Sequence, residues 1–313
     1  MSAKSILIAG VALTLLASTV PAHAQAAPPT SPPPAPGNNI DDRVRQQLRV
    51  PTQSEREEAI LTGDSDIVLT RRTRLFTISG SLDFTATSNA FLAPASPVAD
   101  GLGQAQINLG LGTRIGGKVD IFASVGMVGV RYFDNTALNY NAVTASIGAR
   151  ANFGRLLISA SYQPTIVLSG DFSSRQLTSH RLLISASLPF RLRGVTFEPA
   201  IGGERVLADP ADYNAWSGHA GLTISAPISR KVPIIAYASG QYQRRSFDSY
   251  FTGLVGTDRR DNNWSASVGL VWRPNRWSEV RASYYFQRNT STSDVNAYLA
   301  HSGTLGLSAS LRF

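Results

Sequence analysis

Twelve charged side chains stand at alternate positions of long polar–apolar segments, a spacing that places them on one face of β-strands. They are Asp83, Arg114, Asp120, Arg150, Arg181, Arg191, Glu198, Glu204, Arg273, Glu279, Arg281 and Arg312. Seven are arginines and five are carboxylates. Rings of arginine attract anions where they line a polar passage. The alternative is structural, because opposite charges in a narrow interior pair with one another. Both interpretations follow from the same spacing.

Serine and histidine also recur close together. Ser217 and His219 share a strand face, and His301 precedes Ser302. A serine nucleophile needs a base within hydrogen-bonding distance and a third group that orients the base. No aspartate or asparagine in that role is evident beside Ser217 and His219, and their face is predicted to point inward. We therefore predict that the chain is not an enzyme.

The chain contains no cysteine, which excludes zinc–thiolate sites and thiol catalysis. Asp258, Asp261 and Asp294 lack the ligand spacing of calcium loops, so we interpret them as solvated loop charges. The glycines do not precede a helix in the pattern of a phosphate-binding loop. We predict no metal and no cofactor.

The formal net charge is +8, and nearly all basic residues are arginines. They are dispersed along strands and turns, whereas proteins that bind nucleic acid cluster basic residues on one face. We predict no nucleic-acid partner.

From Leu75 to the end, hydrophobicity alternates with period two. We identify twelve candidate strands, most of them 10 to 15 residues long. Strands of soluble proteins have about 5–6 residues, whereas a tilted strand that crosses a bilayer needs about 9–11. Short turns alternate with longer polar loops, as in membrane barrels. The predicted fold class is all-β, an antiparallel transmembrane β-barrel of about twelve strands.

The two faces of the predicted strands differ in an unusual way. Trp264, Val268 and Trp272 alternate with Ser265 and Ser267, so large apolar side chains share one face and small polar ones the other. A small polar face is unlike a dry protein core, which indicates that the apolar face contacts lipid. In the segment IIAYASGQYQ, which begins at Ile234, the alternation does not indicate clearly which side chains point outward.

The residues before the barrel fall into three predicted segments. Residues 1–24 are typical of a signal peptide, with Lys4 before an apolar stretch and the small Ala22 and Ala24 at the cleavage site. Residues 25–39 form a proline-rich linker. Residues 40–73 form a charged periplasmic segment with one possible short helix, and 74–313 form the barrel.

The last strand, HSGTLGLSASLRF, places Leu307, Leu311 and Phe313 on one face and ends on the aromatic residue. It resembles the closing strand of Gram-negative outer-membrane β-barrels of the porin type, including the C-terminal signal that the barrel-assembly machinery reads. The resemblance implies export to the bacterial outer membrane, contact with its lipid, and a porin or channel for ions or small hydrophilic solutes. The alternative is a non-conducting structural or assembly barrel whose N-terminal segment plugs the lumen or binds a periplasmic partner.

Overall fold

The computed structural model describes residues 76–313 except 95, 116–118, 230–231, 249–258, 276 and 313, and the side chain of Arg312. The three predicted segments before the barrel lie outside these residues. The described strands are β1 (Phe76–Thr87), β2 (Asp100–Ile115), β3 (Val119–Tyr132), β4 (Tyr140–Phe153), β5 (Leu156–Ser169), β6 (Arg175–Ser187), β7 (Phe190–Leu192), β8 (Val195–Asp209), β9 (Ala215–Pro227), β10 (Ile234–Phe247), β11 (Arg260–Trp272), β12 (Ser278–Ser291) and β13 (Tyr298–Arg312).

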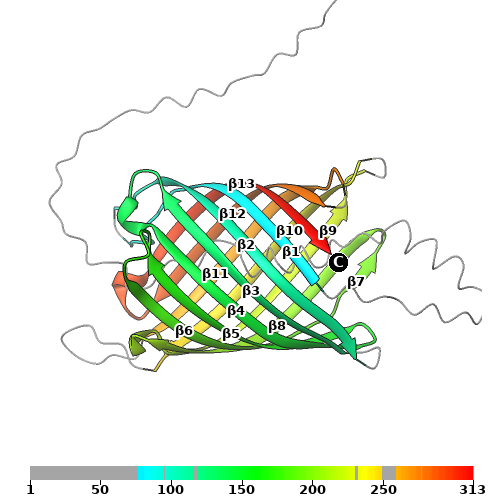
Figure 1. Cartoon of the computed structure of the whole chain (residues 1–313), viewed down its shortest axis with the longest axis horizontal. Helices are drawn as coiled ribbons and strands as arrows, with labels where there is room; N and C mark the ends of the chain where they lie inside the picture. The colour runs from blue at the N-terminus through cyan, green and yellow to red at the C-terminus, as the bar shows by residue number, and fades with distance from the viewer. Residues whose placement is uncertain are drawn as a thin grey trace, which may run out of the picture.

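All pairs of neighbouring strands are antiparallel, and they close into one tilted barrel (Figure 1). The first strand pairs with the last, from Thr77 opposite Arg312 to Thr87 opposite Ser302. Strands β6 and β7 are one barrel strand interrupted at Leu188 and Pro189, since both pair with β8. Proline has no N–H to donate to the ladder, which explains the break. The barrel therefore has twelve strands, as predicted.

The connections separate the two ends of the barrel. At one end, which we call the short-turn end, they contain two to six residues. At the other, the long-loop end, they contain five to twelve residues, and three of them hold a 3-10 turn: η1 (Thr136–Leu138), η2 (Ala211–Tyr213) and η3 (Asp294–Asn296). The start of β1 and the end of β13 lie at the short-turn end. In bacterial barrels that end faces the periplasm.

The prediction that large apolar side chains point outward and small polar ones point inward is confirmed. Leu82, Ile147 and Val268 point outward and are 53%, 57% and 54% exposed, whereas Ser81 and Ser267 point inward and are buried. The structure also assigns the face that the sequence left open. On β10, Ile235 and Tyr237 point inward and pack against Val271 of β11 and Tyr285 of β12. This strand alternates weakly in sequence because its inner face is apolar in one half and polar in the other.

Aromatic side chains mark both edges of the outer apolar wall. At the short-turn end Phe190 and Phe197 stack with ring centroids 5.3 Å apart. Strand β11 carries Trp264 near the long-loop end and Trp272 near the other. At about 3.4 Å per residue and a tilt of about 40°, these two indoles are about 21 Å apart along the membrane normal, close to the roughly 25 Å apolar band of membrane barrels. In the described part of the chain, no helix is long and apolar enough to cross a membrane.

We expect the cost of an outward charge to depend on its depth. Val268 stands midway between Trp264 and Trp272, so Val268→Arg places a cation at the centre of the hydrocarbon and should destabilise the folded barrel by about 2–4 kcal/mol. Thr113→Arg, on the outer face near the short-turn end of β2, should cost about 0–1 kcal/mol. Urea unfolding in lipid vesicles measures both. Equal costs would contradict the assignment of this wall to lipid.

Candidate functional site

The interior of the barrel is lined by small hydroxyl side chains. Several face one another across neighbouring strands at hydrogen-bonding distance: Thr85 and Thr304 at 2.8 Å, Ser124 and Ser146 at 2.7 Å, Thr144 and Thr165 at 3.0 Å, Ser159 and Ser185 at 2.7 Å, and Ser239 and Ser267 at 2.7 Å. A hydroxyl group both donates and accepts, so each pair satisfies itself and still presents oxygen lone pairs to the interior. The inner wall is thus lined with small polar groups.

The charged residues singled out in the sequence stand at inward positions of this wall wherever their side chains are described. They are Asp83 on β1, Arg114 on β2, Asp120 on β3, Arg150 on β4, Arg181 on β6, Arg191 on β7, Glu198 and Glu204 on β8, Arg273 after β11, and Glu279 and Arg281 on β12. For Arg312 the structure gives the backbone position, opposite Thr77. Most of the carboxylates have an arginine partner.

The most enclosed of these ion pairs joins two strands that are not neighbours. Nη2 of Arg281 on β12 donates to Oδ1 of Asp83 on β1 at 2.8 Å, and both side chains are buried. Strand β13 runs between them, and Gly306 is opposite both residues in the register. A Cβ at Gly306 would lie 2.0 Å from Oδ1 of Asp83. The ion pair therefore requires glycine at position 306, because any side chain there would overlap the carboxylate of Asp83.

A second ion pair lies on the opposite side of the barrel. Nε of Arg181 donates to Oε1 of Glu204 at 2.9 Å, between β6 and β8. Arg245 of β10 and His219 of β9 also interact electrostatically with this buried carboxylate. One carboxylate thus interacts with basic side chains from three other strands.

Two further pairs lie within hairpins at the short-turn end. Arg114 donates twice to Asp120, at 2.6 and 3.1 Å, and Arg273 donates to Glu279 at 3.1 Å. The first pair is substantially exposed. Such pairs stabilise little, but each places a positive and a negative charge side by side at this mouth of the barrel.

Near the long-loop end, the structure corrects one interpretation. Asp261 was predicted to be a solvated loop charge, and this is wrong. It lies on β11, is buried, and accepts hydrogen bonds from Arg259 at 2.6 Å and from Ser291 at 2.6 Å. The sequence analysis missed this pair because the clear alternation starts at Trp264, whereas β11 begins four residues earlier, at Arg260. It also missed Arg245, whose alternation with Gln243 and Gln241 was the available signal.

The inner wall near the long-loop end is apolar over β2 to β5. Its buried cluster contains Ala90, Leu102, Val130, Tyr132, Leu138, Tyr140, Ala142 and Val167. Ala90 comes from the loop after β1, and Leu138 from η1, so two loops fold onto this wall. Asn89 secures the first loop, because its amide donates to the carbonyls of Ala93 at 2.8 Å and of Leu299 on β13 at 3.1 Å. These contacts make the inner wall over β2 to β5 more apolar at this mouth than in the middle of the barrel.

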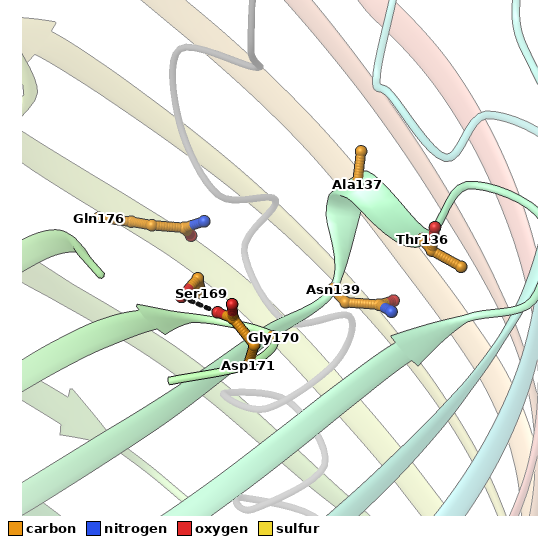
Figure 2. Close-up of a pocket in the computed structure, with 7 residues that line it drawn as sticks. All are labelled: Thr136, Ala137, Asn139, Ser169, Gly170, Asp171 and Gln176. Atoms are coloured by element: carbon orange, nitrogen blue, oxygen red, sulfur yellow. Dashed lines mark hydrogen bonds between the residues drawn. The ribbon is translucent and has the colours of Figure 1, made fainter. Parts of the chain in front are cut away.

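An open hollow of about 420 Å³ lies at the same rim, lined by Thr136, Ala137, Asn139, Ser169, Gly170, Asp171 and Gln176 (Figure 2). Its only lining carboxylate is Asp171, whose Oδ1 accepts hydrogen bonds from Ser169 Oγ at 2.5 Å and from Ser173 Oγ at 2.8 Å. These hydroxyl groups and the N–H of Ser173 lower the pKa of Asp171 to about 2. The hydrogen bonds to this carboxylate thus stabilise the loop that contains it.

Ser217 and His219 both face the interior, as predicted. The Oγ of Ser217 accepts a hydrogen bond from Gln243 at 3.0 Å. The ring of His219 lies over Gly202, directly opposite on β8, where a Cβ would approach its Nε2 to 2.6 Å. These contacts account for the positions of both side chains through packing.

The chain matches no protein-family model, and a search of the curated proteins finds no relative. Solved structures match its fold. An outer-membrane channel from Pseudomonas putida F1 has a TM-score of 0.50 and 11% identity, covering 77% of this chain and 96% of that one. The translocator domain of autotransporter NalP from Neisseria meningitidis has a TM-score of 0.40 and 16% identity, covering 85% and 97%. The KdgM porin in complex with disordered oligogalacturonate has a TM-score of 0.39 and 9% identity, covering 73% and 98%. All are outer-membrane β-barrels with differing functions, so the likeness shows the fold and assigns neither catalysis nor transport.

Gly306→Ala is expected to break the ion pair between Asp83 and Arg281. The new methyl group overlaps the carboxylate, and separating a buried ion pair costs about 3–5 kcal/mol. Gly303→Ala on the same strand is the matched control, since its Cβ would meet nothing within 4 Å. It should change the free energy of unfolding by less than about 0.5 kcal/mol. Equal stability of the two variants in urea would contradict the proposed need for Gly306.

The titration of Asp171 should depend on its serine neighbours. The folded loop lowers the pKa of this carboxyl from 3.8 to about 2, so the hydrogen bonds favour the folded loop above the unfolded value and are lost as the pH falls through about 2. Ser169→Ala removes the largest cause and should raise the pKa toward 3.8. Carboxyl 13C shifts measure it. Ser174→Ala, whose side chain does not contact Asp171 in the described contacts, should leave it unchanged.

Proposed function

Because the chain folds as a transmembrane β-barrel of the kind found in bacterial outer membranes, we propose that it is a channel for ions and small hydrophilic solutes. The inner wall supports this proposal. Its middle consists largely of serine, threonine and glycine, which offer hydrogen bonds while occupying little volume. Twelve strands enclose more space than the eight whose side chains fill a small barrel. A wall built only for stability would be expected to hold larger, interdigitating side chains.

The proposal includes a weak preference for anions. The described inward charges nearly balance, because seven arginines stand against seven carboxylates, and only Arg312, known from its backbone position, would add to the arginines: Arg114, Arg150, Arg181, Arg191, Arg245, Arg273 and Arg281 against Asp83, Asp100, Asp120, Glu198, Glu204, Asp261 and Glu279. The ion pairs described above reduce the field that a passing ion meets. The pairing therefore favours a weaker selectivity than the sequence hypothesis of a cation-lined channel.

The segments before the barrel belong to the same proposal. Residues 1–24 would direct export and be removed after Ala24. Residues 40–73 would lie on the periplasmic side, because β1 begins at the short-turn end. Leu307, Leu311 and Phe313 would present the closing strand to the barrel-assembly machinery.

The deciding experiment is conductance of the mature protein in a planar bilayer, beside a truncated form that begins at Arg72. Discrete current steps in both forms are expected. Steps from the truncated form alone would make the preceding segment a plug. Silence from both, with the barrel shown to be folded by circular dichroism, would contradict the channel and favour the structural or assembly role.

Selectivity tests the part played by the inner arginines. A unit charge about 5 Å from a permeant ion changes its energy in water by about 0.8 kcal/mol, which salt screening reduces. Arg150→Gln should therefore lower the permeability ratio of chloride to potassium by about twofold. Arg175→Gln is the matched control, because Arg175 forms an exposed ion pair with Asp209 outside the lumen. The reversal potential in a salt gradient measures both, and identical values for the two variants would exclude Arg150 from the ion path.

A further inference from the structure

The outer wall of the barrel carries a basic patch at the long-loop end that the channel does not use. It consists of Arg244 on β10, Arg260 on β11 and Arg288 on β12, gathered around Trp264. Trp264 points outward and is 54% exposed. Arg288 is directly opposite Trp264 in the register, and Arg244 is directly opposite Asn262, two residues before Trp264 on the same face. The patch therefore faces outward, and all three arginines are exposed.

The patch lies at the edge of the apolar wall. The ring of Trp264 packs against that of Tyr242 with centroids 4.5 Å apart, as part of the aromatic girdle. Along β11, Val268 continues the exposed apolar surface to the membrane centre, and Leu270 continues it beyond the centre. A molecule bound here would contact hydrocarbon-facing side chains with one part and arginines with the other.

Charge on this part of the wall is of one sign. In the described strands β9 to β13, the outward positions carry no carboxylate. Within the described part of the chain, neither Arg244 nor Arg288 forms an ion pair or a hydrogen bond through its side chain.

Arginines at the same rim elsewhere have partners. Arg131 donates to the carbonyls of Tyr140 at 3.0 Å and Gly170 at 3.0 Å, and Arg205 pairs with Asp248. Arg244 and Arg288 thus differ from these neighbours in having guanidinium groups available to a ligand from outside the chain.

Strands in a sheet are about 4.8 Å apart, and Arg244 and Arg288 are separated by β11 and by a two-residue offset. Their backbones are therefore about 12 Å apart. Long side chains on both can reach the groups of one headgroup. Guanidinium groups bind phosphate through two parallel N–H donors, and indole rings favour the headgroup level of a bilayer.

We propose that this patch binds the phosphate groups of a phosphorylated lipid in the outer leaflet, with its acyl chains lying along β10 to β12. The patch is at the end opposite the start of β1 and the end of β13, which is the outward end in bacterial barrels. The proposal depends on the barrel and its orientation, and not on conduction: a barrel that fails to conduct would still bind the lipid.

The test uses the purified full chain in neutral detergent and native mass spectrometry. The probes are bisphosphorylated lipid A and the same lipid with its phosphates removed. The wild type should bind the phosphorylated form about tenfold or more tightly. R244Q/R288Q should lose this preference, while R244K/R288K should retain binding well above the glutamine variant because the charge remains. Thermal melting checks that each variant is folded.

The matched control is R155Q/R193Q, which removes two exposed arginines from turns at the short-turn end. It should bind like the wild type. Equal binding of the two lipids by the wild type, or wild-type binding by R244Q/R288Q, would overturn the proposal. Inorganic phosphate is the third probe. If it binds as tightly as the phosphorylated lipid, the patch is a site for free phosphate and the lipid proposal is wrong.

Discussion

Pairing of every strand edge is the constraint on which the rest of this structure depends. Hydrocarbon offers no hydrogen bonds, so an unpaired edge would leave a row of costly backbone groups. The ladder from Thr77–Arg312 to Thr87–Ser302 closes one gap, and the pairing of β6 and β7 with β8 closes the other. Even at Pro189 the loss is local, because the N–H of Leu188 still donates to the carbonyl of Pro199 at 3.1 Å. Closure also fixes which side chains face lipid and which face the lumen.

Inside the closed barrel, space is controlled by placing glycine opposite large side chains. Asn108 lies opposite Gly126, Phe122 opposite Gly148, His219 opposite Gly202, Tyr237 opposite Gly269, and Asp83 and Arg281 opposite Gly306. A Cβ on each glycine would come within 3 Å of the facing side chain, except for Arg281, which it would approach to 3.4 Å. The large group therefore lies flat against the wall of the neighbouring strand. This arrangement keeps bulky and charged groups along the wall rather than across the lumen.

The arginines that dominate the basic charge have two different environments. Those inside mostly meet carboxylates, as Arg281 meets Asp83 and Arg181 meets Glu204. Arg244 and Arg288, on the outer wall beside Trp264, have no such partner in the described part of the chain. The same residue type thus serves internal neutralisation in one place and leaves uncompensated charge at the membrane surface in another. Net charge alone cannot distinguish these uses, because it averages over both faces.

The sequence by itself determined the features that repeat locally. Period-two alternation predicted the strands, their number and their faces, because successive side chains of a strand point to opposite sides wherever the strand is placed. It also predicted the inward positions of the charged residues. Tertiary structure alone decided their partners: Asp83 and Arg281 are 198 residues apart and meet only because β13 closes the sheet between them. The face of β10 and the burial of Asp261 also depended on neighbouring strands and loops. Hairpin turns fix the register of consecutive strands, but no turn joins β1 to β13, so their register belongs to the closed sheet alone.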